Sequence, residues 1–403
     1  MHIRCIQCGA TYELHERVLA CTRCGDLLEI VVRVDRPVEE LKKIWRERRM
    51  SNDPRDRSGV WRFREFLPHE YSQVITLAEG NTPLVTAQRS GAWAGMRRLQ
   101  YKHLGWNPTA CFKDLGMTTG VTEAYFVGAR IVACASTGNT SGSMAAYAAR
   151  AGITARVYLP KGMVSLAKVA QALDYGAELV EIDGNFDQAL STMLASGDGQ
   201  IYFLNSINPF RIEGQKTVIF EMMEQLEWEP PDYIVCPGGN LGNSSAFGKA
   251  LEELKAHGLI SKVPRMIVVQ AAGANPLYRT WRDGSAELQV VAQPETLATA
   301  IRIGNPKSWK KALRVLQFSN GLVLDVTDEE IGDAKEMIGK DGIGCEPASA
   351  TTLAGLKKLA ARKMIDPEAS VVAILTGHVL KDTDFIIKRH QYGKPADRAA
   401  GKP

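Results

Sequence analysis

The chain has 403 residues, enough for two or three domains with substantial apolar cores. Hydrophobic residues make up 45% and charged residues 23%, which is typical of a soluble enzyme. The net charge of +4 gives no support for nucleic-acid binding. No uninterrupted apolar stretch of about 18 residues predicts a membrane span, and the N-terminus lacks the apolar region of a signal peptide, so we expect a cytoplasmic protein.

Two cysteine pairs stand near the N-terminus. Cys5 and Cys8 form the first pair, Cys21 and Cys24 form the second, and a glycine follows each pair. Glycine lets the backbone turn so that both thiolates of a pair can face one ion. The spacing predicts a zinc ribbon in residues 1–34, with all four thiolates around a structural zinc ion. Redox-active dithiols and unligated thiols are the alternatives.

A charged helix and a linker follow in residues 35–74. From Ile75 onward, apolar runs alternate with amphipathic helical patterns, which predicts an α/β fold of two doubly wound, mainly parallel sheets. The predicted strands are 99–104, 130–134, 154–159, 177–182, 201–203, 233–236, 266–270 and 371–375. The predicted helices are 38–50, 114–127, 141–151, 166–175, 214–226, 244–255 and 348–361. We expect a large domain (75–98 and 205–388), a small one (99–204) and a flexible tail (389–403).

Lys113 stands where a predicted strand gives way to a predicted helix. It follows a turn of Asn107, Pro108 and Thr109 and comes directly after Phe112. A poorly solvated amine loses part of its preference for the protonated form, so it can attack an aldehyde. An ordinary strand-to-helix turn is the alternative.

Two further loops follow predicted strands, where open α/β sheets bind their ligands. The first bares successive backbone N–H groups at a helix start, which predicts a cradle for a single phosphate, with a plain tight turn as the alternative. Its residues are Gly238, Gly239, Asn240, Leu241, Gly242 and Asn243. The second is rich in short polar side chains, which suit a carboxylate or simply cap the helix. Its residues are Ser136, Thr137, Asn139 and Thr140.

A second anion site is predicted after strand 201–203. Asn205, Ser206 and Arg211 supply donors there, and arginine suits bidentate binding of phosphate. A second anion site implies a phosphorylated substrate, whereas a salt bridge is the alternative role for Arg211. Thr376 directly follows strand 371–375.

These segments together resemble the fold-type-II pyridoxal-phosphate enzymes. The resemblance implies that the Lys113 amine carries the cofactor as a Schiff base next to Phe112 and also transfers protons. It implies that residues 238–243 bind the cofactor phosphate. It also implies that Asn139 hydrogen-bonds the ring hydroxyl of the cofactor and that Thr376 contacts its pyridine nitrogen. Ser136, Thr137 and Thr140 would receive the substrate carboxylate.

The resemblance narrows to the threonine synthases through segments 79–84, 205–217, 300–306 and 346–349, and it covers roughly residues 75–385. It implies an enzyme that converts O-phospho-L-homoserine and water to L-threonine and phosphate, by γ-elimination of phosphate and β-addition of water. We expect a homodimer. Ala110-Cys111 and Leu115 depart from the usual residues of this group. A cysteate synthase (phosphoserine and sulfite), a threonine dehydratase and a noncatalytic ribbon protein are the alternatives.

Overall fold

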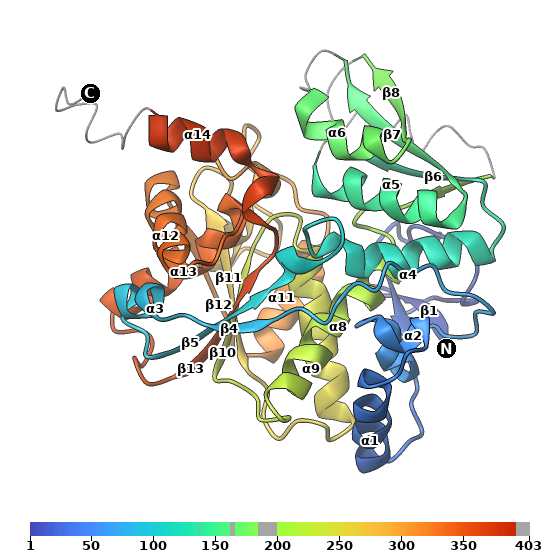
Figure 1. The fold of residues 1–403 in the computed structure, drawn as a ribbon, viewed down its shortest axis with the longest axis horizontal. Coiled ribbons are helices and arrows are strands. Elements are labelled where there is room, and N and C mark those ends of the chain that lie inside the picture. Colours follow the sequence, from blue (N-terminus) through green and yellow to red (C-terminus); the bar gives the residue numbers. More distant parts are fainter. Residues whose placement is uncertain (137, 162–165, 184–199, 392–403) are drawn as a thin grey trace.

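The computed structural model describes residues 1–136, 138–161, 166–183 and 200–391, and Figure 1 shows its elements. Its two larger sheets have six and four strands, and a three-stranded sheet lies at the N-terminus. The six-stranded sheet has the order β12 (Leu322–Val326), β11 (Arg265–Ala271), β10 (Tyr233–Pro237), β13 (Ser370–Leu375), β5 (Arg98–His103) and β4 (Leu84–Thr86). The four-stranded sheet has the order β8 (Glu178–Ile182), β7 (Thr154–Pro160), β6 (Ile131–Ala135) and β9 (Ile201–Phe203).

The pairing confirms two mainly parallel sheets. All neighbours in both sheets are parallel except β4, which pairs antiparallel with β5 at one edge. Strand β5 lies inside the range predicted for the small domain, yet it pairs with β13 and β4 in the six-stranded sheet. The spacing of apolar residues predicts that a segment is a strand, but it does not identify the neighbouring strands in the sheet. The sequence therefore predicted the strand and placed it in the wrong sheet. Strand β12 was not predicted.

Helices cover both faces of the six-stranded sheet. One apolar core joins that sheet to α8, α9 and α11, and a second joins it to α3, α12 and α13. A third core packs α4 and α5 against the four-stranded sheet. The α-helices are α1 (Val38–Arg49), α2 (Pro54–Arg57), α3 (Arg89–Ala94), α4 (Lys113–Phe126), α5 (Asn139–Ala151), α6 (Leu166–Asp174), α8 (Pro209–Gln225), α9 (Gly242–Ala256), α10 (Pro276–Arg282), α11 (Trp309–Phe318), α12 (Asp328–Lys340), α13 (Pro347–Ala361) and α14 (Thr383–Gln391). The 3-10 helices are η1 (Trp61–Phe66), η2 (Leu104–Trp106), η3 (Thr299–Ile301) and η4 (Val379–Lys381).

Helices α4 and α8 pack against each other at glycines. A Cβ atom at Gly214 of α8 would lie 1.8 Å from the backbone oxygen of Leu115 in α4. A Cβ atom at Gly120 of α4 would lie 3.2 Å from Cγ of Arg211 in α8. Real Cβ atoms essentially never approach another atom as closely as the 1.8 Å at position 214, so this helix separation requires glycine there, while the contact at position 120 would be tight. The close packing places the first turn of α8, with Arg211, beside α4.

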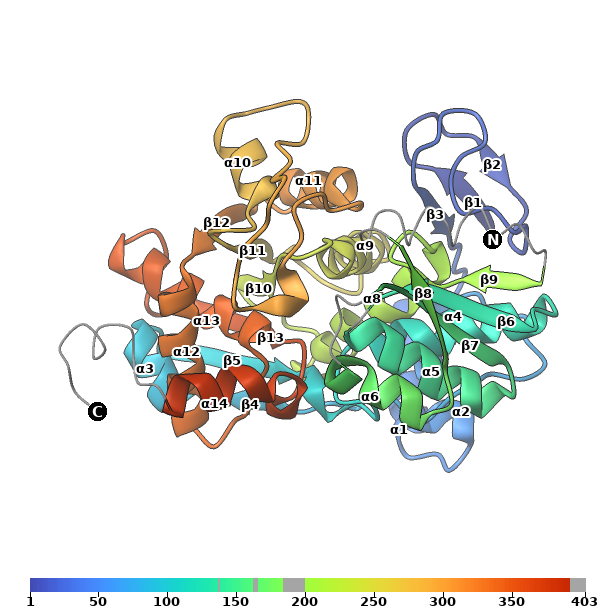
Figure 2. The ribbon, with the colours of Figure 1, turned by 90° about the horizontal axis from the view of Figure 1, so that it is seen from above.

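The N-terminal ribbon (residues 1–34) is a three-stranded antiparallel sheet that packs on the large domain. Its strands have the order β2 (Thr11–Tyr12), β1 (His2–Cys5) and β3 (Leu28–Val31). Figure 2 shows the ribbon beside α8 and α9, and β3 contacts α8. Among the described helices, none is both long and apolar enough to cross a lipid bilayer.

Candidate active site

Lys113 is the first residue of α4, and its amine is free to react. Its side chain is partly exposed, and in the described part of the chain Nζ has no hydrogen-bond acceptor or carboxylate partner; it lies 4.3 Å from the Phe112 ring centroid. Burial, and next the positive charge of Arg211, lower the pKa of Lys113 to about 8. A substantial neutral fraction therefore exists near neutral pH, as a nucleophile toward an aldehyde requires.

The loop before Lys113 is tied to the end of strand β13. The Phe112 N–H donates to the Thr376 carbonyl oxygen at 2.9 Å, and Cys111 forms a β-bridge with Gly377. Cys111 is fully buried, and desolvation followed by the charge of Asp114 raises its pKa to about 11. Cys111, one of the departures from the usual residues of the group, is thus a neutral thiol that fills space beside the lysine turn.

Glu346 joins two of the predicted cofactor-binding residues. Its carboxylate accepts hydrogen bonds from Asn139 Nδ2 at 2.9 Å and from Thr376 Oγ1 at 2.8 Å. It is 3% exposed, and burial raises its pKa. Ser349 lies 3.0 Å from Thr376 in the same cluster. Segment 346–349 carries part of the family resemblance, but no role was predicted for Glu346; its position directly before a buried helix start was the available signal.

The polar loop leads into α5. Ser136 Oγ accepts from the Gly138 N–H at 3.3 Å, and Thr140 is partly buried in the first turn of the helix. Thr137, also predicted to bind a carboxylate, lies outside the described residues.

Residues 238–243 form a turn at the N-terminus of α9. Leu241 adopts the left-handed conformation with φ of 65°. In the described ranges, no acceptor is present for the backbone N–H groups of Gly239, Asn240 and Leu241. A Cβ atom at Gly239 would lie 3.1 Å from Ile301, so a side chain there would crowd the loop. Donors without acceptors at a helix start suit an anion such as a phosphate. Two hydrogen bonds anchor the turn at its ends. The Gly238 N–H donates to the Val269 carbonyl oxygen, and Asn243 Nδ2 donates to the Pro237 carbonyl oxygen.

The second set of predicted phosphate donors adjoins this turn. Asn240 Nδ2 donates to Ser206 Oγ at 2.5 Å, and Asn205 Oδ1 accepts from the Ala135 N–H at 3.3 Å. Arg211 is 2% exposed and donates from Nη1 to the Leu204 carbonyl oxygen at 2.9 Å, whereas its buried Nε has no partner. No carboxylate among the described residues forms an ion pair with Arg211. Burial lowers its pKa to about 10, which still leaves a charged guanidinium near the Lys113 amine.

Four cysteines of the ribbon converge. The Sγ atoms of Cys5, Cys8, Cys21 and Cys24 all lie within 4.8 Å of one another. Cys5 lies 3.5 Å from Cys24, and Cys8 lies 3.5 Å from Cys21. Four thiolates bound to zinc at about 2.3 Å stand roughly 3.8 Å apart, so these residues fit a tetrahedral zinc ion.

Comparison with protein families identifies the chain. Residues 75–377 match the family model described as pyridoxal-phosphate dependent enzyme. The chain belongs to this family. It is 46% identical over 389 residues to a threonine synthase of Methanocaldococcus jannaschii, covering 96% of this chain and 94% of that protein. It is 44% identical over 394 residues to a threonine synthase of Methanosarcina acetivorans, covering 96% and 93%. Within the family the chain groups with the threonine synthases, which are pyridoxal-phosphate dependent lyases.

Solved structures agree on the fold. A fungal L-serine ammonia-lyase from Rhizomucor miehei superposes with a TM-score of 0.67 at 20% identity, covering 79% of this chain and all (100%) of that chain. A maize serine racemase superposes with a TM-score of 0.64 at 21% identity, covering 78% and 92%. Both confirm the predicted fold class.

The side chains present fit pyridoxal phosphate. The cofactor needs a nucleophilic amine for its aldehyde and an anion site for its phosphate. Lys113 would supply the amine, and the turn at 239–241 would supply backbone donors that have no acceptor among the described residues. Asn139 and Thr376, both bonded to Glu346, supply polar groups for the ring.

Proposed function

We propose that this chain converts O-phospho-L-homoserine and water to L-threonine and phosphate. Arg211 carries this proposal, because it is a buried cation that forms no ion pair with any described residue, so a ligand anion can be its partner. The turn at residues 238–243 would hold the cofactor phosphate, so the Arg211 site remains for a phosphate on the substrate. A threonine dehydratase, whose substrate has no phosphate, would leave Arg211 without a purpose. The sequence relatives that are named threonine synthases support the same reaction.

The chain's own residues would bind, orient and transfer protons. Bound pyridoxal phosphate supplies an electron sink that stabilises negative charge at the substrate α-carbon. The Lys113 amine would take the proton from Cα and then one from Cβ, since its lowered pKa suits general acid–base work near neutral pH. Phosphate would leave from Cγ with the electron pair of the C–O bond, and Cγ would gain a proton. The hydroxyl group of water would then add at Cβ and Cα would regain a proton, while the remaining proton goes to the released phosphate. Arg211 would stabilise the departing phosphate.

A product assay tests this reaction directly. With O-phospho-L-homoserine, the holoenzyme should release one phosphate for each threonine formed. Phosphoserine with sulfite is the parallel substrate pair, and the cysteate that it would yield identifies the alternative reaction. Release of cysteate without threonine would contradict the proposal. The homodimer and the cytoplasmic location stay predictions; sedimentation velocity tests the first.

The pH dependence of cofactor attachment tests the assignment of Lys113. The rate at which pyridoxal phosphate links covalently to the apoprotein should rise as the pH increases through about 8, because only the neutral amine attacks. A lysine with an ordinary pKa would show this rise at a pH of about 10.4. The charge of Arg211 contributes to lowering the Lys113 pKa, so Arg211→Met should move the midpoint upward. Stopped-flow absorbance measures the rate, and an unchanged midpoint in Arg211→Met would contradict the juxtaposition.

The ribbon cysteines are proposed to bind one structural zinc ion. Chelation or Cys5→Ser should therefore release one metal ion and loosen residues 1–34, while cofactor binding stays largely intact, because the ribbon contributes no residue to the cofactor turn. Elemental analysis and limited proteolysis measure the two effects. Cys236→Ser, which alters a buried thiol of β10, is the matched control and should leave the metal content unchanged. Loss of cofactor absorbance on chelation would contradict the prediction.

A further inference from the structure

Phe210 of α8 lies in the apolar core of the ribbon. Its side chain is 2% exposed and belongs to one buried cluster whose other members all come from the ribbon. Those members are Ile3, Cys5, Ala10, Leu14, Cys21, Leu28 and Ile30. Two of them, Cys5 and Cys21, belong to the cysteine cluster. A residue next to Arg211 in the chain therefore depends for its packing on the ribbon.

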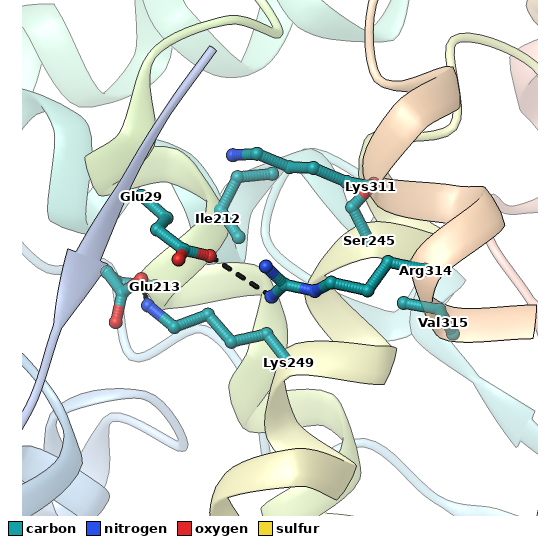
Figure 3. A pocket seen from close by; sticks show the side chains of 8 residues that line it. All are labelled: Glu29, Ile212, Glu213, Ser245, Lys249, Lys311, Arg314 and Val315. Carbon is teal, nitrogen blue, oxygen red and sulfur yellow. Dashed lines mark hydrogen bonds and ion pairs between the residues drawn. The ribbon is translucent and has the colours of Figure 1, made fainter. Parts of the chain in front are cut away.

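A polar contact ties the same helix to the ribbon a second time. Lys249 of α9 donates from Nζ to the Ile30 carbonyl oxygen of β3 at 2.5 Å and forms an ion pair with Glu213 of α8. Figure 3 shows these side chains around a small cavity between β3, α8, α9 and α11. Lys311 donates to the Leu28 carbonyl oxygen at 2.6 Å, and Arg314 pairs with Glu29 at 3.1 Å. Buried lysines are costly without acceptors, so the β3 backbone completes this interface.

Arg211 stands between the two contacts, after Phe210 and before Glu213. The Phe210 carbonyl oxygen accepts from Thr119 Oγ1 of α4 at 2.8 Å, so α4 supports the opposite side of the turn. The guanidinium itself has one hydrogen bond, to Leu204, and no ion pair among the described residues. Its position relative to Lys113 is therefore set by the backbone of the first turn of α8.

We propose that Phe210 is a positioning residue: the ribbon core holds its ring and so places Arg211 for the substrate phosphate. The ribbon then sets the affinity for the phosphorylated substrate, although none of its residues reaches that site. This inference rests on the proposed role of Arg211 as the ligand of that phosphate. A displacement of about 1 Å in a positioning group weakens productive binding substantially, which is the physical basis of the coupling.

Phosphate binding to the holoenzyme tests the proposal, because the cofactor phosphate already fills the turn at residues 238–243. Phe210→Ala should weaken inorganic phosphate binding in equilibrium dialysis and raise KM for O-phospho-L-homoserine, each by roughly three- to thirtyfold. The kcat should change much less, and cofactor absorbance and affinity should stay unchanged. Phe210→Leu, which restores an apolar side chain to the ribbon core, should recover most of the loss.

Phe220→Ala is the matched control. Phe220 lies on the same helix and is fully buried, but it packs against Phe63 and Phe66 in the large-domain core. Its loss should lower the melting temperature while phosphate affinity stays near that of the wild type. Chelation of the wild-type ribbon metal, which needs no variant, should weaken phosphate binding by a similar factor. The same treatment should have little further effect on Phe210→Ala, because the coupling is already broken.

The outcomes separate this inference from the proposed function. If Arg211→Ala leaves phosphate binding intact, the substrate phosphate does not bind at Arg211, and the proposed function loses its main support. If Arg211→Ala abolishes binding while Phe210→Ala matches Phe220→Ala, the phosphate site stands and the ribbon coupling is wrong. Unchanged phosphate affinity after chelation of the wild type would overturn the coupling even if Phe210→Ala failed to fold.

Discussion

Lys113→Ala should abolish the covalent link to the cofactor and lower turnover by about 10²- to 10⁴-fold, the range expected when a general acid–base group is lost. The cofactor should still bind noncovalently, because the backbone donors at residues 239–241 do not depend on the lysine. Borohydride reduction followed by peptide mapping measures the link. In the wild type the reduced adduct should lie on Lys113, and in the variant it should be absent.

Lys311 is an internal control for this experiment. Its pKa is also lowered to about 8 by burial, yet its Nζ donates to the Leu28 carbonyl oxygen in the ribbon interface. A lowered pKa alone therefore does not identify a cofactor lysine. The proposal for Lys113 rests also on its amine, which has no hydrogen-bond partner among the described residues and feels the charge of Glu346. An adduct on Lys311, or one that persists in Lys113→Ala, would contradict the assignment.

Arg211→Ala should lower kcat/KM for the phosphorylated substrate by roughly tenfold to a hundredfold or more. The reason is that a charge-assisted hydrogen bond contributes about 1.5 to 3 kcal/mol, and the guanidinium of Arg211 is buried beside its proposed ligand. Inorganic phosphate should inhibit the wild type and lose that effect in the variant. Arg211→Lys keeps the charge without the planar fork and should give an intermediate result. Steady-state kinetics of the wild type and both variants, with and without phosphate as a competitor, measures these effects.

Two variants serve as controls for Arg211. Gly239→Val crowds the turn against Ile301 and should release the cofactor while the Arg211 site stays intact. Arg62 is equally buried but forms an ion pair with Glu224 at 2.9 Å, so Arg62→Ala should lower stability and leave phosphate inhibition unchanged. If Arg211→Ala released the cofactor and kept phosphate inhibition, the two anion sites would be reversed.

The sequence by itself determined the elements whose chemistry lies in consecutive residues. The cysteine pairs, the turn before Lys113 and the turn at residues 238–243 each consist of a few neighbouring residues, so local spacing was enough to locate them. The alternation of strands and helices likewise predicted two parallel sheets, because each period is a property of one segment.

Only the tertiary structure decided which distant residues meet. Glu346 bonds Asn139 across 207 positions, and Phe210 enters a core built from the first 30 residues. Strand β5 joins the six-stranded sheet by pairing with β13, far along the chain. Such contacts depend on how helices and sheets pack, for example on the glycines that bring α4 against α8, and no local pattern encodes them. For that reason the turns that carry the candidate site could be located in the sequence, whereas the packing of Phe210 in the ribbon core could not.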